Sequence, residues 1–296
     1  MTRGFDWIIV ANPNSGRYGA IHHGRMVDQY LTSKGFTSLI LESTSNSDFK
    51  DSFSSLLQEG RPRGGVIVLG GDGTVHQTAN IIHQIDSSIP FGVIPMGTGN
   101  DFAMQCGLLT IDPAKLMEMY TTDAPVDIDV IKVDQRICLQ IMSSGFDARV
   151  SERSRTLPTF LKNLRYVLAL FIELGRFEVL RYELEIDGRK DSRHAMMVSC
   201  ANGRNYGGGM LLSPHSDHQD GILELVVLHP VSRVELLKVF PRIFSGSHIF
   251  HPAFEVIPFR NLHLRADTIS QGDGEDMFSQ PIDLSISAST VKTWKI

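Results

Sequence analysis

The stretch GVIVLGGDGT, residues 65–74, decides the fold of this chain. Its aliphatic run predicts a buried strand, and three glycines surround one aspartate where that strand ends. A comparable stretch, FGVIPMGTGND, follows at residues 91–101. Glycines at a strand end let the backbone approach a ligand closely, and free N–H groups there can hold phosphate. The two stretches therefore predict phosphate-binding loops at the ends of neighbouring strands.

Each loop also carries an aspartate, Asp72 in the first and Asp101 in the second. A carboxylate would repel a bare phosphate, so these positions make chemical sense if a magnesium ion lies between the two groups. A tight turn that ends in a helix capped by Thr74 is the structural alternative for the first loop. Because the arrangement occurs twice, with the hydroxyl of Thr98 in the second loop, phosphate binding is the leading interpretation.

Length and composition limit the class of protein. The chain has 296 residues, of which 42% are hydrophobic and 21% charged, which suits a soluble globular protein of one large or two modest domains. A net charge of −5 gives no support to nucleic-acid binding. Three widely spaced cysteines predict a reducing compartment. The apolar run at residues 166–172 is shorter than the roughly 20 residues of a membrane span, so we expect a cytoplasmic protein that can touch a membrane from outside.

Strand and helix signals alternate over the first third of the chain. Strands are expected at 7–11, 38–42, 65–69 and 91–94, and helices at 21–33, 47–58 and 75–85. This alternation predicts an α/β domain with a mostly parallel sheet over residues 1–126. Ligands of such sheets bind beyond the carboxyl ends of the strands, where both glycine loops fall.

The pattern changes after about Val126. Strands are expected at 128–133, 137–143, 182–186, 195–201, 222–228, 254–258 and 261–266. Turn signals such as Asp187-Gly188 and Asp220-Gly221 join them. They predict an all-β-rich, antiparallel sandwich domain over residues 127–281, interrupted by a helical insert at 157–174. A last strand at 282–287, within residues 282–296, can return to the first domain.

A third polar segment, NPNSGR at residues 12–17, follows the first strand. Asn12 and Ser15 are small polar residues that precede a helix, and Arg17 could pair with phosphate oxygens. An ordinary strand–turn–helix connection explains the same residues equally well.

In order and spacing, residues 12–16, 70–74 and 95–101 resemble the catalytic domain of the diacylglycerol/sphingosine-type lipid kinases. The second half is similar to the small bacterial members in these motifs: GFDA at 145–148, GGG at 207–209 with Pro214, Asp220-Gly221 and Asp273-Gly274-Glu275. The resemblance covers nearly the whole chain. It implies an NAD kinase/diacylglycerol kinase-like fold and transfer of the γ-phosphate of ATP to a lipid hydroxyl, with diacylglycerol as the default lipid.

The resemblance also implies a nucleotide site in the cleft between the two domains, with Asp101 near the phosphates and Mg²⁺. Asp273 matches the family's proton acceptor for the lipid hydroxyl, with Glu275 beside it as a metal or orienting carboxylate. A surface Gly-Asp-Gly turn is the structural alternative for Asp273. The candidate nucleotide-binding residues are Asn12, Ser15, Arg17, Thr44, Gly70, Gly71, Asp72, Gly73, Thr74, His76, Gly97, Thr98 and Asn100.

A candidate metal site lies in the stretch PHSDHQD, residues 214–220, which contains two histidines and two aspartates. The spacing fits no standard zinc pattern. The resemblance instead implies a structural Mg²⁺ on Asp220, completed by the backbone carbonyls of Leu223 and Leu225, and oxygen ligands suit this hard cation. A plain Asp-Gly turn is the alternative. The chain departs from the bacterial pattern at His76 and Gln77, which puts one polar contact there in question.

Residues 149–181 contain seven basic and three acidic residues, a local charge of +4. Apolar residues recur there at helical spacing. The segment predicts either a helix that rests on an anionic membrane and gives access to the lipid, with Lys162 and Arg165 among its charges, or a helix that covers the sandwich core. A homodimer is a further possibility.

Two other functions are considered beside the lipid kinase. An NAD kinase-like enzyme shares a Gly-Gly-Asp-Gly loop and acts on a soluble dinucleotide, but Asp273-Gly274-Glu275 argues against it. A non-catalytic nucleotide or lipid sensor would keep the fold without turnover. The presence of four carboxylates argues against that: Asp72, Asp101, Asp273 and Glu275.

Overall fold

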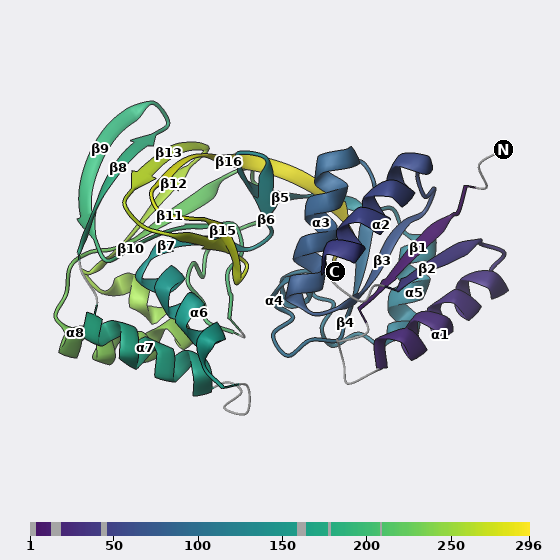
Figure 1. Cartoon of the computed structure of the whole chain (residues 1–296), viewed down its shortest axis with the longest axis horizontal. Coiled ribbons are helices and arrows are strands. Elements are labelled where there is room, and N and C mark those ends of the chain that lie inside the picture. The colour runs from purple at the N-terminus through teal and green to yellow at the C-terminus, as the bar shows by residue number, and fades with distance from the viewer. Residues whose placement is uncertain (1–3, 13–18, 43–45, 159–163, 177–178, 208) are drawn as a thin grey trace. The chain divides into compact units, whose positions relative to one another are not determined.

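The computed structural model describes residues 4–12, 19–42, 46–158, 164–176, 179–207 and 209–296. The chain forms two compact units, Met1–Ile128 with Thr290–Ile296, and Asp129–Ser289. The first is an α/β unit and the second a β sandwich with helices (Figure 1), which confirms the predicted fold class.

The first unit is built on a parallel sheet. Its strands are β1 (Trp7–Ala11), β2 (Ser38–Glu42), β3 (Gly65–Gly70) and β4 (Phe91–Pro95), in the order β2-β1-β3-β4. Every described pair among them is parallel. All residues of β1 and β3 are buried, as expected for central parallel strands that are covered on both faces.

The helices of this unit follow the strands in the predicted alternation. They are α1 (Gly19–Ser33), α2 (Asn46–Glu59), α3 (Asp72–Asp86), α4 (Asp101–Gln105) and α5 (Pro113–Thr122). The helix expected from residue 75 begins three residues earlier. The Gly71 carbonyl accepts hydrogen bonds from the N–H groups of Thr74 and Val75 at 3.0 and 3.1 Å, so Gly71 is the N-cap and Asp72 lies in the first turn.

The C-terminal strand β16 (Ile282–Thr293) has residues in both units. Thr293 pairs in parallel with Phe91 and donates its hydroxyl to the Phe91 carbonyl at 2.7 Å. Trp294 is buried, donates its ring N–H to the Asp123 carbonyl at 2.9 Å, and packs on Tyr120. The end of the chain is therefore part of the core of the first unit.

The second unit contains two antiparallel layers. The first has the order β12-β11-β10-β7-β14-β15, and the second the order β16-β13-β8-β9. The strands of the first are β7 (Ile141–Gly145), β10 (Met197–Ala201), β11 (Leu223–Leu228), β12 (Phe254–Phe259), β14 (Ser270–Gly272) and β15 (Glu275–Phe278). Those of the second include β8 (Leu180–Ile186), β9 (Arg189–Ala195) and β13 (Asn261–Ala266). A hairpin of β5 (Val126–Val133) and β6 (Arg136–Cys138) pairs with β16.

Alternation of side chains divides the six-stranded sheet between two buried cores. Met142 and Leu225 belong to the core shared with β8, β13 and β16. Their neighbours Ile141 and Val226 belong to a core shared with helices α6 (Phe146–Thr156), α7 (Leu164–Arg176) and α8 (Arg233–Val239). Figure 1 shows these helices on one side of β7, β10 and β11. The helical layer continues into the 3-10 turns η2 (Phe240–Ser245) and η3 (Ser247–Phe250).

Three expected elements of this unit were wrong in their bounds. The strand predicted at 137–143 is divided into β6 and β7, because residues 139–141 donate their N–H groups to the carboxylate of Asp273. The strand predicted at 195–201 is divided at Met196, where the chain passes from one sheet to the other. The insert predicted as one helix over 157–174 begins only after α6 has ended at Thr156: residues 157–158 are not helical, residues 159–163 lie outside the described residues, and α7 follows from Leu164.

Among the helices that the structure describes, none combines the length and the apolarity that crossing a bilayer requires.

Candidate active site

The first glycine loop joins the end of β3 to the start of α3. Gly71 is the N-cap, with φ of −94°, and Asp72 is the first helical residue. The start of a helix presents backbone N–H groups and the positive end of the helix dipole. The loop therefore offers the kind of backbone that binds phosphate in other proteins.

The two glycine loops lie in direct backbone contact. A Cβ atom on Gly97 would lie 2.6 Å from the Cα atom of Gly71. The Met96 N–H donates to the Gly70 carbonyl at 3.0 Å. A Cβ atom on Gly70 would in turn meet Thr74 at 2.6 Å. Close approach of the other main chain at Gly97 and of the Thr74 side chain at Gly70, rather than a left-handed backbone, explains why glycine occupies these positions.

Asp72 fastens the second loop to the first. Its Oδ2 accepts a hydrogen bond from the Asn100 N–H at 2.7 Å. Asn100, with φ of 56°, holds Gly97 through two side-chain bonds: Oδ1 accepts from its N–H at 2.9 Å and Nδ2 donates to its carbonyl at 2.8 Å. A Cβ atom on Gly99 would lie 2.6 Å from Asp72 Oδ2. Asp72 thus has a structural task in addition to its predicted place near phosphate.

Two further candidates of the first unit are tied to α3. Asn12 Nδ2 donates to the Thr74 hydroxyl at 3.0 Å, which brings the end of β1 to the first loop. The buried ring of His76 lies with its Nε2 3.2 Å from Nδ2 of Asn80, one turn further along the helix. His76 therefore has a contact within α3, and its contact with a nucleotide stays a prediction.

The structure places Asp101 and Thr98 beside these loops with different exposure. Asp101 is the first residue of α4 and is buried, whereas Thr98 is exposed. Ser15, Arg17 and Thr44 lie outside the described residues, so their predicted nucleotide contacts stay predictions.

In the second unit, Asp273 occupies a two-residue turn between β14 and β15. Its φ is 52° and that of Gly274 is 83°. The carboxylate accepts N–H groups from Leu139 at 2.6 Å (Oδ2) and from Gln140 and Ile141 at 2.9 and 3.2 Å (Oδ1). Three backbone donors on two carboxylate oxygens hold the group in one orientation.

Arg155 of α6 supports this turn, and the sequence carries no signal of it. Its Nη1 donates to the Gly274 carbonyl at 2.7 Å, and its Nη2 pairs with the carboxylate of Asp276. Glu275, beside them, is exposed. The pairing joins residues about 120 positions apart, and no local pattern marks Arg155 among the basic residues of α6.

The predicted metal site lies where the loop before β11 enters the sheet. Asp220 is exposed, and its Oδ1 accepts from the Ile222 N–H at 2.9 Å. Leu223 pairs with Phe259 on the β12 side, whereas Leu225 is paired on both sides, so the Leu225 carbonyl already belongs to the sheet ladder. Within the described part of the chain, no three His, Cys, Asp or Glu side chains are grouped as metal ligands.

The acidic surroundings nevertheless suit a hard cation. Burial raises the pKa of the Glu224 carboxyl, the negative charges of Asp220 and Asp217 raise it further, and a hydrogen bond from the Ser216 hydroxyl opposes them. A bound cation would relieve this crowding, and oxygen donors are the ligands Mg²⁺ prefers. The exposed carboxylate of Asp220 is compatible with Mg²⁺, whereas the Leu225 carbonyl is already engaged in the sheet.

A buried polar chain connects this loop to the Asp273 turn, and the motifs did not point to it. Asn202 Nδ2 donates to the carbonyls of Asp129 and Leu139 at 2.6 and 3.1 Å. Asp129 Oδ2 accepts from the Gly221 N–H at 2.7 Å. Because Leu139 also donates to Asp273, the predicted base and the predicted metal loop share one hydrogen-bonded framework.

Comparisons with known proteins agree with the resemblance found in the motifs. The family model of the diacylglycerol kinase catalytic domain matches residues 6–133, and that of the YegS C-terminal NAD kinase beta sandwich-like domain matches residues 140–294. A diacylglycerol kinase of Mycobacterium tuberculosis is 28% identical over 286 residues, which cover 94% of this chain and 91% of the relative. A diacylglycerol kinase of Bacillus subtilis is 27% identical and covers 81% and 79%.

Among solved structures, a diacylglycerol kinase from Bacillus anthracis matches with a TM-score of 0.72 at 18% identity, covering 100% of this chain and 98% of the other. At this identity the match shows the fold alone.

Proposed function

Because this chain belongs to the diacylglycerol kinase-like family of lipid kinases, we propose that it transfers the γ-phosphate of ATP to the hydroxyl group of diacylglycerol. The observation that carries the proposal is the pair of glycine loops before α3 and α4, held together by the Gly71–Gly97 contact and the Asp72–Asn100 hydrogen bond. Phosphoryl transfer needs mainly positioning and charge neutralisation. Diacylglycerol is proposed because the relatives from M. tuberculosis and B. subtilis carry its name.

The proposed roles of the first unit follow from its two loops. Backbone N–H groups at the start of α3 and of Thr98 and Gly99 hold the phosphates, while the N–H groups of Gly97 and Asn100 are bound within the loops. Asp101, buried at the start of α4, is proposed to lie near the phosphates and their Mg²⁺. Mg²⁺, when bound, supplies positive charge that offsets the charge of the transferring group.

The second unit is proposed to supply the proton acceptor. The lipid hydroxyl oxygen forms a bond to the γ-phosphorus, the bond to the β–γ bridging oxygen breaks, ADP leaves, and Asp273 takes the hydroxyl proton. Its three backbone donors keep the carboxylate in one orientation before the lipid arrives. Glu275 is proposed as an orienting or metal-binding carboxylate beside it, and Asp220 as the ligand of a structural Mg²⁺.

The lipid is proposed to be reached at a membrane surface through residues 149–181. In the structure α7 of this segment packs through Leu170 and Leu174 into the core between the helices and the six-stranded sheet, which is compatible with a membrane contact on its other face. Lys162 and the side chain of Arg165 lie outside the described residues. Replacing both with glutamate should weaken binding to anionic vesicles, and unchanged binding would remove this role of the segment.

A substrate panel tests the function. The enzyme is incubated with radiolabelled ATP, Mg²⁺ and detergent micelles that contain diacylglycerol, monoacylglycerol, ceramide or sphingosine, with NAD as a soluble acceptor in a separate arm. Labelled phosphatidic acid as the main product supports the proposal. If the labelled phosphate goes mainly to another lipid, that lipid replaces diacylglycerol as the proposed substrate. If it goes to NAD alone, the proposed function is replaced by that of a kinase of a soluble substrate.

A further inference from the structure

The segment from α8 to η3 exposes large apolar side chains on its outer face. Val234, Leu237 and Phe244 are 63%, 38% and 55% exposed, and Phe250 is 81% exposed. Pro241 is exposed as well. Val234, Leu237, Pro241 and Phe244 follow one another at intervals of three, four and three residues, which is the spacing of one face of a helix. We call Val234, Leu237, Pro241, Phe244 and Phe250 the outer stripe.

The opposite face of this segment fixes its orientation. Leu236 and Ile243 are buried in the core beneath the six-stranded sheet, and Val239 is buried as well. These positions follow the same helical spacing with the opposite phase. The outer stripe therefore cannot turn inward without removing Leu236 and Ile243 from the core, so its exposure is a property of the folded unit.

Helix α7 adds two apolar side chains to the same helical layer. Leu170 and Leu174 of α7 share the buried core with Leu236. On its other face Leu168 and Phe171 are 42% and 53% exposed. Monomeric proteins rarely expose several large apolar side chains together, and such patches mark sites of protein or membrane contact.

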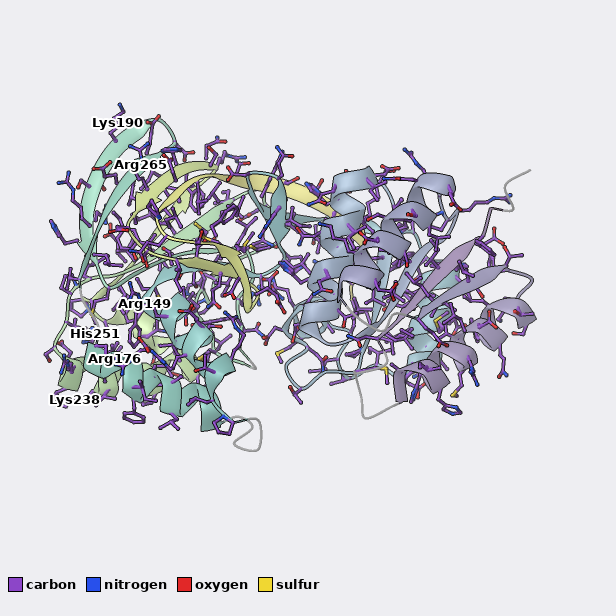
Figure 2. All side chains as sticks on the ribbon, viewed as in Figure 1. Arg149, Arg176, Lys190, Lys238, His251 and Arg265 are labelled. Atoms are coloured by element: carbon purple, nitrogen blue, oxygen red, sulfur yellow. The ribbon has the colours of Figure 1, made fainter. Side chains whose placement is uncertain are left out.

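Positive charge accompanies the outer stripe. This segment contains three positively charged residues, Arg233, Lys238 and Arg242, and one negatively charged residue, Glu235. The whole chain, by contrast, has a net charge of −5. The Glu235 carboxylate is 3.3 Å from the ring of His251. Figure 2 shows Lys238, Arg176 and His251 at the same end of the second unit, and Lys190 at the opposite end, on the β8–β9 hairpin. The apolar stripe thus coincides with a local reversal of the chain's charge.

We propose that the outer stripe docks on the surface of an anionic lipid bilayer. Apolar side chains would enter the boundary between headgroups and acyl chains, while lysine and arginine remain at the level of the lipid phosphates. In a two-fold dimer the stripe would face its own copy and the positive charges would repel each other, so the positive charge favours an anionic membrane over a second copy of this chain. The inference rests on the proposed function, since a kinase of membrane lipids must meet its substrate at such a surface.

Vesicle flotation without nucleotide tests the proposal. The probes are vesicles of phosphatidylcholine alone and of phosphatidylcholine mixed equally with phosphatidylglycerol. The double variant Phe244→Ser with Phe250→Ser should bind the mixed vesicles more than about tenfold more weakly, because two phenyl rings no longer leave water. Met26→Ser is the matched control, since Met26 is 53% exposed on α1, and it should bind as the wild type does.

A second pair of variants separates charge from apolar contact. Lys238→Glu with Arg242→Glu should remove the extra binding conferred by phosphatidylglycerol and leave binding to phosphatidylcholine unchanged. Lys190→Glu, at the opposite end of the unit, should retain the phosphatidylglycerol effect. Because these charge variants change only surface residues, they still test the docking proposal if the double phenylalanine variant does not fold.

The outcomes separate this proposal from the proposed function. Vesicle binding like that of the wild type by both double variants overturns the docking surface, whatever the turnover on micellar diacylglycerol. Vesicle binding through the outer stripe without any lipid phosphorylation supports docking and contradicts the proposed function. If light scattering shows a dimer that Phe244→Ser with Phe250→Ser converts to a monomer while vesicle binding is unchanged, a second copy covers the stripe and the proposal is overturned.

Discussion

The Asp273 turn and the Asp187 turn of the second unit have the same local structure in different surroundings. Each is a two-residue Asp-Gly hairpin turn, with φ of 52° and 83° at Asp273-Gly274, and 46° and 81° at Asp187-Gly188. Each aspartate donates its N–H at 2.9 Å to a carbonyl of a neighbouring segment and accepts N–H groups from that segment with its carboxylate. Backbone geometry therefore does not distinguish a candidate base from an ordinary turn.

The surroundings make the difference. The carboxylate of Asp187 accepts from Asn261 at 2.8 Å and from Arg260, at an exposed turn. Asp273 has three donors, is half-buried, and is followed by Glu275. Arg155 binds the Asp273 turn from α6. The two turns therefore differ in the charge and the burial that other segments add around the aspartate, and this difference is what the proposed base role of Asp273 depends on.

The largest expected effect comes from replacing the carboxylate of Asp273, compared with the same replacement at Asp187. Asp273→Asn should lower kcat on diacylglycerol by on the order of 10²–10⁴-fold, the usual contribution of a general base. Asp187→Asn is the matched control, because it alters the carboxylate of the other Asp-Gly turn, which also accepts backbone N–H groups; its kcat should stay near that of the wild type. Lipid kinase assays and thermal unfolding of both variants provide the measurement.

Equal losses of activity in these two variants, in step with equal losses of stability, would contradict the base role and leave Asp273 as a structural residue.

The glycine contact of the first unit is the next feature to test. In Gly97→Ala the new Cβ atom would lie 2.6 Å from the Gly71 Cα atom, so the loops must separate, at a cost of about 1–3 kcal/mol. We expect ATP affinity to fall about tenfold or more, measured by calorimetry. Gly60→Ala is the control, since nothing lies within 4 Å of its added atom. ATP affinity of Gly97→Ala equal to that of Gly60→Ala would argue against a phosphate site at the paired loops.

Arg155 distinguishes the two turns of the second unit, and its loss should have a smaller effect. The ion pair with Asp276 is exposed, so Arg155→Gln should change the free energy of unfolding by less than about 1 kcal/mol. The Gly274 carbonyl loses its donor, and kcat should fall about threefold to tenfold because the carboxylate of Asp273 is held less firmly. A kcat unchanged within error would show that the turn needs no support from α6.

The smallest effect is expected at Glu224, a partly buried carboxyl group close to two other carboxylates. Its folded pKa is raised, mainly by burial and then by Asp220 and Asp217. The folded protein therefore holds this proton more tightly than the unfolded chain does, and stability falls as pH rises from the unfolded value near 4.5 through the raised folded value.

Glu224→Gln should flatten this part of the stability curve and stabilise the protein at neutral pH, measured by urea unfolding across pH in the presence of a chelator. A slope equal to that of the wild type would show that Glu224 is not strained. Added Mg²⁺ should stabilise the wild type and have a smaller effect on Asp220→Asn.

Much of the α/β unit could be predicted, because local pattern and tertiary role coincide there. The apolar run of β3 is buried on both faces, and the glycines after it end the strand where the pattern placed the loop. In the second unit the patterns were less informative. The polar strand β9, RKDSRHA, has no apolar alternation and exists because β8 pairs with it along its whole length. The strand expected at 137–143 is divided by Asp273, more than 130 residues later in the chain.

The sequence by itself determined the family, the two glycine loops and the candidate carboxylates, because each is a short run whose residue types limit the local backbone. Tertiary structure alone decided that Asp72 binds Asn100, that Asp273 holds residues 139–141, that Arg155 supports the Asp273 turn, and that the outer stripe stays exposed. Those features depend on which distant segments pack together. Hydrogen bonds and burial between such segments have no periodicity or spacing in the chain that could reveal them.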